Sequence, residues 1–217
     1  RPEVFSWWLL AAGGLLLLPM GLFLMWYDPV TGPGWWFVLG TIALHTVYFT
    51  LLARGYARGD LSLVYPIARG TGPALVPLLG VVLLGERMAP QAAGGVAAVV
   101  VGILVASWWE RLRSLLDDPF QVVKSRAIVY ALLTGLTIAG YSIWDTQGVK
   151  HVNPFLYMYL LTLGSAVVLA PYHFWRRGKA AMVAEWRANW PYIVAASLLT
   201  FVAYGLVLTA LTFTQVS

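Results

Sequence analysis

The sequence predicts an all-α membrane protein, a bundle of about seven transmembrane helices. Of its 217 residues, 60% are hydrophobic and only 11% are charged, with a mean hydropathy of +0.75, whereas soluble domains carry about 25% charged residues. Long apolar stretches recur along the chain, each near the roughly 20 residues that a helix needs to cross a bilayer. The 11 tryptophans and 11 tyrosines suit a protein that needs aromatic anchors at two membrane interfaces.

Seven stretches are long and apolar enough to span a membrane. They cover residues 4–27, 35–53, 61–85, 91–109, 128–149, 154–175 and 191–213. The first lacks the small-residue cleavage pattern of a signal peptide, so we expect it to remain as a helix. Residues 91–109 are rich in glycine and alanine, which permits close helix packing and predicts a homodimer contact through these small-residue faces.

Two longer connections, residues 110–127 and 176–190, join the predicted helices. In the second, Met182, Val183, Trp186 and Trp190 could share one helical face. This pattern predicts a short helix lying in the membrane interface, with a solvated linker as the alternative.

Basic residues gather on one side of the predicted bundle. Eleven of the 14 Lys and Arg residues fall there: Arg1, Arg54, Arg58, Arg111, Arg113, Lys124, Arg126, Arg176, Arg177, Lys179 and Arg187. Only Arg87 and Lys150 fall on the other side, and Arg69 lies within a span. The positive-inside rule places the basic side in the cytoplasm. We therefore relate the net charge of +5 to the membrane, and expect lipid rather than nucleic acid as a partner.

A weak internal repeat links the two halves of the chain. A shift of 152 residues places 5–19 on 157–171, so that Leu9 meets Leu161 and Pro19 meets Pro171. The first of these helices begins on the basic side, and its counterpart begins on the opposite side. Sequence-related halves that cross the membrane in opposite directions are typical of inverted-repeat secondary transporters.

Residues 59–88, GDLSLVYPIARGTGPALVPLLGVVLLGERM, are followed by a small-residue helix that ends in GILVAS. This arrangement, and Leu84-Gly85-Glu86-Arg87 above all, resembles the EamA type of the drug/metabolite transporter superfamily. The resemblance implies ten helices, arranged as two inverted five-helix repeats around a central cavity, in a bacterial inner or plasma membrane. Many members of the family place their first loop outside the cell, whereas the charge distribution here places the loop of Arg1 inside.

On that pattern the chain corresponds to helices two to eight, and we expect a fragment of a longer protein. Residues 1–109 form the first repeat without its first helix, and 110–127 form the loop between the repeats. Residues 128–217 form the second repeat without its last two helices. We interpret Glu86 and Arg87 as a signal for a helix end and a turn.

Arg69 is the most informative residue of the third predicted span. It lies between Pro66 and Pro73 and beside Gly70 and Gly72, so the helix must bend or open locally there. We predict that these four neighbours form a gate. An ionisable residue at such a break is a candidate functional site.

Arg69 and His45 should lie at a similar depth in the membrane, which predicts a pocket around Arg69. Arg69 lies about 12 Å from the basic end of its helix, and His45 lies about 13 Å from the same side. Tyr65 and Tyr48 are shallower. We predict that Arg69 binds an anionic group such as a carboxylate, in a pocket lined by Tyr65, His45 and Tyr48. Alternatively, Arg69 extends to the basic face or braces open carbonyls around Gly70.

Asp145 is the other charge within a span, and Tyr141 lies one helical turn before it. Asp145 is about 25 Å along its helix, near the opposite face, so we do not expect an ion pair with Arg69. We predict that Asp145 takes up a proton or cation, or receives an amino group, with Tyr141 beside it in the substrate site. The alternative is a carboxylate at a helix end in the interface.

Sequence motifs favour transport over catalysis. The chain lacks a G-x-x-x-x-G-K-[ST] phosphate loop, its three histidines have no metal-ligand spacing, and no Ser–His–Asp grouping is suggested. We therefore expect no enzyme activity, no cofactor and no metal. The resemblance implies a secondary transporter of a small metabolite, an amino acid or another carboxylated compound, with or without ion coupling. The alternatives are an integral-membrane enzyme or flippase acting on lipid, and a non-transporting scaffold or receptor.

Overall fold

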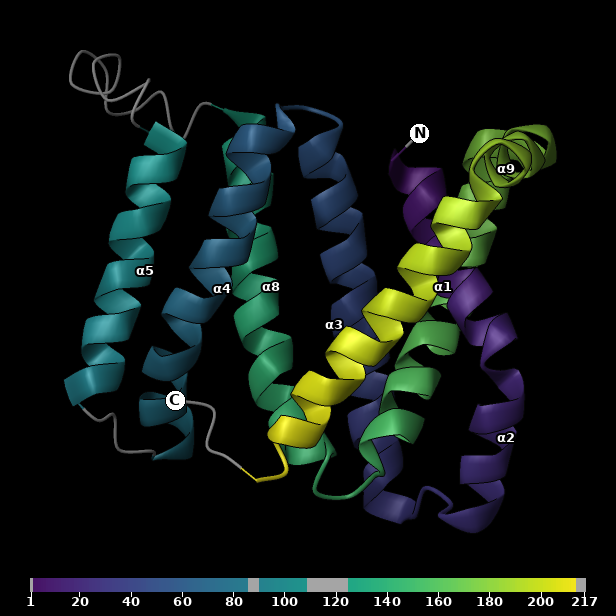
Figure 1. Cartoon of the computed structure of the whole chain (residues 1–217), viewed down its shortest axis with the longest axis horizontal. Coiled ribbons are helices and arrows are strands. Elements are labelled where there is room, and N and C mark those ends of the chain that lie inside the picture. Colours follow the sequence, from purple (N-terminus) through teal and green to yellow (C-terminus); the bar gives the residue numbers. More distant parts are fainter. Residues whose placement is uncertain (1, 86–89, 109–124, 214–217) are drawn as a thin grey trace. The chain divides into compact units, whose positions relative to one another are not determined.

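The computed structural model describes residues 2–85, 90–108 and 125–213. These residues form helices joined by short turns, without a strand among them, which confirms the all-α class. The helices are α1 (Pro2–Leu16), α2 (Leu18–Tyr27), α3 (Gly32–Tyr56), α4 (Leu61–Leu84), α5 (Pro90–Trp108), α8 (Arg126–Gly148) and α9 (Pro154–Ala210) (Figure 1). Glu86, Arg87, most of the predicted loop 110–127 and the last residues of the chain lie outside the described part.

Four described helices are long and apolar enough to cross a membrane: α3, α4, α8 and α9. The pair α1 and α2, bent by 55° at Leu17, makes a fifth candidate span. Pro19 at the start of α2 has no N–H to give to the preceding turn, which accounts for a break at this point. The bent pair and the helices α3, α4 and α8 each coincide with one span predicted from the sequence, whereas α9 covers two.

Helix α9 holds the last two predicted spans and the link between them. Its 57 residues would reach about 85 Å in a straight helix, far more than a ~30 Å hydrocarbon core. The helix breaks at Gly178, where φ is 75° and ψ is 154°, a region that is essentially restricted to glycine. The parts of α9 therefore run in different directions: in Figure 1 the part near the α9 label is seen along its axis, whereas the yellow end of the helix runs across the page. The link 176–190 is thus helical apart from Gly178, as the sequence predicts.

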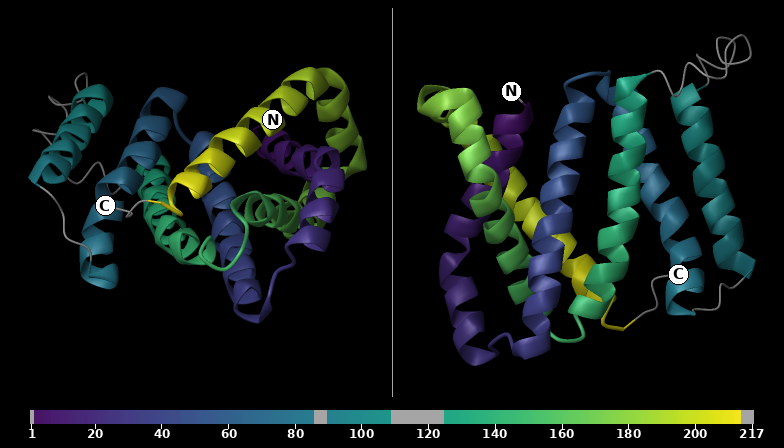
Figure 2. Two further views of the ribbon diagram at one scale, coloured as in Figure 1. Left: turned by 60° about the horizontal axis from the view of Figure 1, so that its bottom comes forward. Right: turned by 180° about the vertical axis from the view of Figure 1, so that it is seen from behind.

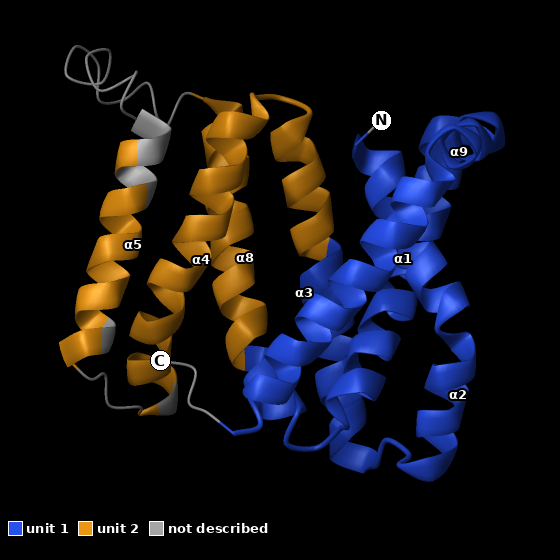
Figure 3. Ribbon diagram, in the orientation of Figure 1, with its two compact units in different colours: residues 1–46, 144–214 blue, residues 47–143, 215–217 orange. Residues whose placement is uncertain are grey.

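The chain forms two compact units (Figure 3). The first unit contains residues 1–46 and 144–214, and the second contains 47–143 and 215–217. Helices α3 and α8 each contribute one part to each unit. The repeat boundaries expected from the sequence stay a prediction.

In the first unit, α1 packs chiefly against α9 (Figure 2). The break at Gly178 divides α9 into a first arm, residues 154–177, and a second arm, residues 179–210. The Trp7 indole donates to the carbonyl of Ala166, on the first arm, at 3.0 Å. The hydroxyl of Ser197, on the second arm, lies 2.8 Å from the carbonyl of Leu9. Gly14 allows close approach, because a Cβ there would lie 2.9 Å from Leu163. Helix α1 therefore packs against both arms of α9 and forms hydrogen bonds with each.

In the second unit, α4 packs against α8 through small residues. Val64 and Ala68 are buried with α8 residues in one apolar cluster, and a Cβ on Gly72 would lie 2.4 Å from Ile138. Helix α5 packs beside α4. The glycines of α5 (Gly94, Gly95 and Gly102) adjoin open space in the described chain, and the homodimer contact through this helix stays a prediction.

Candidate functional site

The carboxylate of Asp145, in the last turns of α8, is fully buried in the first unit. The Tyr157 hydroxyl donates to Oδ1 at 2.8 Å, and the Tyr204 hydroxyl donates to Oδ2 at 2.7 Å. The two tyrosines lie on different arms of α9. Both carboxylate oxygens therefore have a hydrogen-bond donor, and one side chain connects α8 to both arms.

The start of α9 brings Tyr157 to Asp145. Asn153 caps the helix by accepting a hydrogen bond from the Phe155 amide at 3.1 Å. Tyr157 follows in the first turn. A Cβ on Gly148 would lie 2.6 Å from the Tyr157 hydroxyl, so the absence of a side chain at Gly148 leaves room for the phenol.

Helix α3 contributes one face to this site, because Phe37, Thr41 and His45 are spaced by four residues. The Phe37 carbonyl accepts from the Trp144 indole at 2.9 Å and lies 3.2 Å from the Tyr157 hydroxyl. His45 is buried, and its Nδ1 lies 3.0 Å from the Thr41 hydroxyl. The His45 ring packs edge-on against Tyr204, with centroids 5.7 Å apart. His45 therefore adjoins the Asp145 group.

Arg69, on α4 in the second unit, is exposed within the described chain. Its guanidinium carbon lies 5.9 Å from the centre of the Tyr65 ring. Tyr48 and Tyr141 are buried and pack edge-to-face at 5.6 Å. Tyr48, Tyr141 and Tyr56 also lie within the range of electrostatic interaction with the guanidinium. Among residues 2–85, 90–108 and 125–213, no carboxylate forms an ion pair with Arg69.

Helix α4 remains helical through Pro66 and Pro73. Pro73 has no N–H to donate to the carbonyl of Arg69, four residues earlier. Gly70 and Gly72 are buried, and Gly72 faces α8. The gating role of these four residues stays a prediction.

The structure distributes the predicted site residues over the two units. The Arg69 group contains Tyr65, Tyr48 and Tyr141, and the Asp145 group contains His45. From the sequence we paired His45 with Arg69 and Tyr141 with Asp145, on the basis of depth and helical spacing.

Sequence reasoning missed Tyr157, Tyr204 and Tyr56. Tyr204 carried a usable signal, because a phenol in the middle of an apolar span needs a hydrogen-bond partner. Tyr157 lies near the start of a span and is indistinguishable in sequence from an interfacial anchor.

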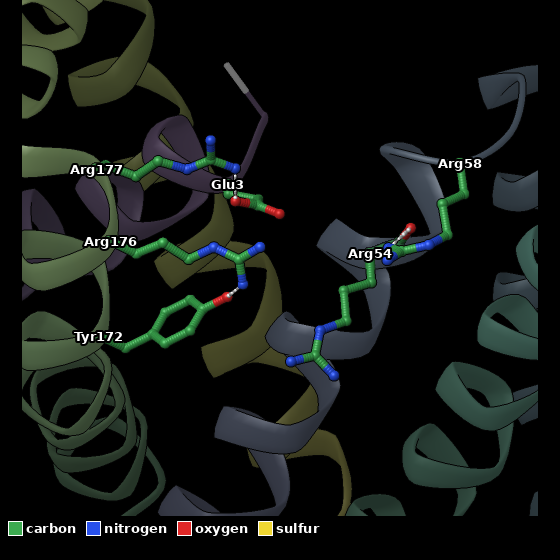
Figure 4. A network of polar contacts seen from close by, with 6 residues as sticks. All are labelled: Glu3, Arg54, Arg58, Tyr172, Arg176 and Arg177. Atoms are coloured by element: carbon green, nitrogen blue, oxygen red, sulfur yellow. Dashed lines mark hydrogen bonds and ion pairs between the residues drawn. The ribbon is translucent and has the colours of Figure 1, made fainter.

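A second set of polar contacts lies near helix ends (Figure 4). In the first unit, Arg177 pairs with Glu3, and Arg176 donates to the Tyr172 hydroxyl at 2.7 Å. The hydrogen bond and the charge of Glu3 raise the pKa of Arg177, which lies in the link between two predicted spans. In the second unit, Arg58 donates to the carbonyl of Arg54 at 3.3 Å. These contacts brace the ends of helices.

The described residues contain no group of three or more His, Asp or Glu side chains that could hold a metal ion. Two charged groups lie within the predicted spans: the buried carboxylate of Asp145, which accepts from two tyrosine hydroxyls, and the guanidinium of Arg69 beside Tyr65. Charged groups inside apolar helices commonly mark the path of a substrate or an ion.

Comparison with known families agrees with this arrangement. The EamA-like transporter family matches residues 1–108, which include α1 to α5. The fold and this match define an integral, multi-pass membrane transporter of the drug/metabolite transporter superfamily. Within that superfamily, the chain belongs to the EamA-like transporter family. No curated protein and no solved structure matches the chain.

Proposed function

We propose that the protein is a secondary transporter that moves a small carboxylated metabolite, such as an amino acid, by alternating access. Its substrate movement is coupled to a proton or another cation. It acts in a bacterial inner or plasma membrane, with the basic loops in the cytoplasm. Membership in the EamA-like family supports transport, and the two polar groups support the substrate class and the coupling.

The guanidinium of Arg69, without a carboxylate partner among the described residues, is the observation that carries the substrate class. An arginine in an apolar helix is costly unless an anion or dipoles compensate its charge. A guanidinium binds a carboxylate through two parallel hydrogen bonds. Tyr65 lies beside it, and phenol hydroxyls can donate to the same carboxylate. A substrate carboxylate therefore fits this group well.

The buried Asp145 supports the coupling. A carboxylate inside a membrane protein can take up a proton, bind a cation or receive a substrate amine. Arg69 and Asp145 carry opposite charges, so we assign the substrate carboxylate to Arg69 and the coupled cation to Asp145.

Replacing Arg69 tests the substrate class. We expect a thermal-shift screen of metabolites on the purified protein to show stabilisation by carboxylated compounds. Arg69→Ala should weaken their binding roughly 10- to 100-fold, because a hydrogen bond to a charged group contributes about 1.5–3 kcal/mol. Arg69→Lys should retain part of the affinity, because it keeps the charge without the paired geometry.

Arg58→Ala is the matched control, because Arg58 is an exposed arginine that follows the end of α3 and should not affect binding. Unchanged affinity in Arg69→Ala would rule out the anion site. Stabilisation by phospholipid alone would favour the lipid enzyme or flippase. Failure of the protein in liposomes to move a carboxylate that it binds would favour a scaffold or receptor.

A further inference from the structure

We propose that Asp145 is a proton-binding site whose hydrogen-bond network satisfies both the ionised and the protonated carboxyl group, with Tyr157 as the switching residue. The use of this proton in transport rests on the proposed function. Proton binding itself depends only on the first unit and requires neither Arg69 nor a substrate.

The observed contacts fit the ionised carboxylate. Tyr157 and Tyr204 each donate one O–H to a different carboxylate oxygen, at 2.8 and 2.7 Å. Hydrogen bonds to an ionised acceptor are roughly twice as strong as neutral ones. Two such bonds offset part of the loss of hydration that burial imposes on the carboxylate.

The same atoms can accommodate the protonated acid. A proton on Oδ1 needs an acceptor, and the Tyr157 oxygen lies 2.8 Å away. Tyr157 must then direct its own hydrogen elsewhere, and the Phe37 carbonyl lies 3.2 Å from its hydroxyl. Tyr204 continues to donate to Oδ2. One proton is added, one hydroxyl rotates, and each of these donors still has an acceptor.

The chemistry of the site favours a proton over a metal ion or an amine. A metal cation needs several oxygen ligands with free lone pairs, whereas both carboxylate oxygens already accept hydroxyl hydrogens. An ammonium group brings three more donors to a site where two phenols already donate. Within the described residues, Asp145 belongs to no group of three or more His, Asp or Glu side chains that could hold a metal ion.

The titratable groups around Asp145 come from α3 and α9. Among the described residues they include Tyr157 and Tyr204 on α9, which donate to the carboxylate, and His45 on α3, which packs against Tyr204. His45 lies within the range of electrostatic interaction with Asp145, so His45→Gln is needed to separate the two groups. Because the phenols belong to different arms of α9, uptake of one proton reverses the direction of the Tyr157 hydrogen bond on one arm and weakens the Tyr204 hydrogen bond on the other.

Infrared difference spectroscopy of the purified protein at different pH values tests the site without substrate. We expect a carboxylic-acid C=O band that appears on acidification, persists in His45→Gln and is absent in Asp145→Asn. Asparagine keeps the shape of the protonated acid, because its oxygen can accept from Tyr204 and its NH₂ can donate to Tyr157. Persistence of the band in Asp145→Asn would overturn the proposal, as would its absence from the unmodified protein.

The tyrosine variants test the switch. Tyr204→Phe removes a donor that favours the ionised form, so the midpoint of the band should move to higher pH. Tyr157→Phe removes a donor to the ionised form and an acceptor for the acid proton, so its midpoint should move less. Equal shifts in the two variants would contradict the switching role of Tyr157.

Transport measurements distinguish this inference from the proposed function. In liposomes carrying a pH-sensitive dye, Asp145→Asn should bind a carboxylated substrate but lose the accompanying proton movement. A titrating band together with unchanged binding in Arg69→Ala would support the proton site and refute the anion site. Loss of binding in Arg69→Ala without any band assigned to Asp145 would support the anion site and refute the proton site.

Discussion

Tyr204 carries a hydroxyl that meets a buried carboxylate inside an apolar helix. It lies in an apolar stretch of α9 and donates to the fully buried carboxylate of Asp145 at 2.7 Å. Because the alternative for both groups is burial without this bond, the contact should contribute more than a hydrogen bond at the surface.

We expect Tyr204→Phe to reduce the free energy of unfolding by about 1.5–3 kcal/mol, the range for a hydrogen bond to a charged group. The loss should shrink on acidification, because a protonated Asp145 accepts a weaker bond. Reversible unfolding in detergent at two pH values measures both effects. Tyr192→Phe is the control, because Tyr192 lies on the same arm and is 71% exposed. Equal effects of the two substitutions would contradict this role of Tyr204.

At this scale the sequence identified the charged residues but not all of their neighbours. The sequence singled out Arg69 and Asp145 because charges are rare in apolar helices, and both lie in helices that are long and apolar enough to cross a membrane. Their roles stay predictions. Tyr157 is 12 residues from Asp145, and Tyr204 is 59 residues away. Contacts over such separations depend on how the helices pack, which residue spacing within one helix does not reveal.

The contact between α4 and α8 depends on glycine. A Cβ on Gly72 would lie 2.4 Å from a methyl group of Ile138 and 3.6 Å from the carbonyl of Gly135. On the α8 side, a Cβ on Gly135 would lie 2.4 Å from Thr71. The two helices therefore approach closely along a line of small residues.

Gly72→Ala should destabilise the protein by about 1–3 kcal/mol, because overpacking forces backbone or side-chain shifts. Thermal unfolding in detergent measures this loss. Gly140→Ala on α8 is the matched control, since a methyl group on Gly140 would meet no described atom of another residue within 4 Å, its own helix backbone aside. The control should be neutral or stabilising, because alanine favours a helix by about 1 kcal/mol over glycine. A neutral Gly72→Ala would contradict the close contact.

The helices themselves followed from the sequence, because apolar length is a strong signal. The link 176–190 was also predicted as a helix, from its amphipathic spacing. Its orientation toward α1 was not predicted. Met182 is fully buried and accepts a hydrogen bond from the Trp8 indole at 2.8 Å through its carbonyl, whereas Val183 is exposed. The proposed common face therefore divides between a packed side and an exposed side.

For the whole molecule, the distribution of basic residues predicts which loops share a side of the membrane. The chain contains no cysteine, so single cysteines can be introduced without removing native ones. Arg58, Lys150 and Lys179 are exposed and lie in or beside connections between predicted spans. We expect Arg58→Cys and Lys179→Cys to react with a membrane-impermeant thiol reagent only from the cytoplasmic side, and Lys150→Cys only from outside.

This labelling pattern follows from the positive-inside rule and from the alternation of spans. A reversed pattern would retain the arrangement of helices but overturn the orientation. Labelling of all three positions from one side would contradict the number of spans between them.

The division into compact units was not visible in the sequence. Each unit takes residues from both predicted repeats: 1–46 with 144–214, and 47–143 with 215–217. A repeat in sequence reports related helices, but it does not report which of them pack together. The boundary between the units falls within α3 after Thr46 and within α8 before Trp144. The sequence around these two points has no distinctive composition.

The contact between Asp145 and Tyr204 also constrains the order in which the chain can assemble. Tyr204 is synthesised 59 residues after Asp145, a delay of roughly 3–12 s at 5–20 residues per second. Throughout that interval the carboxylate lacks its second donor, so the ionised form is poorly matched to a lipid environment. When the second arm of α9 packs in place, Tyr204 supplies this donor and the carboxyl group is buried within the protein. A nascent chain that stalls before this step keeps an acid with only one of its two tyrosine donors.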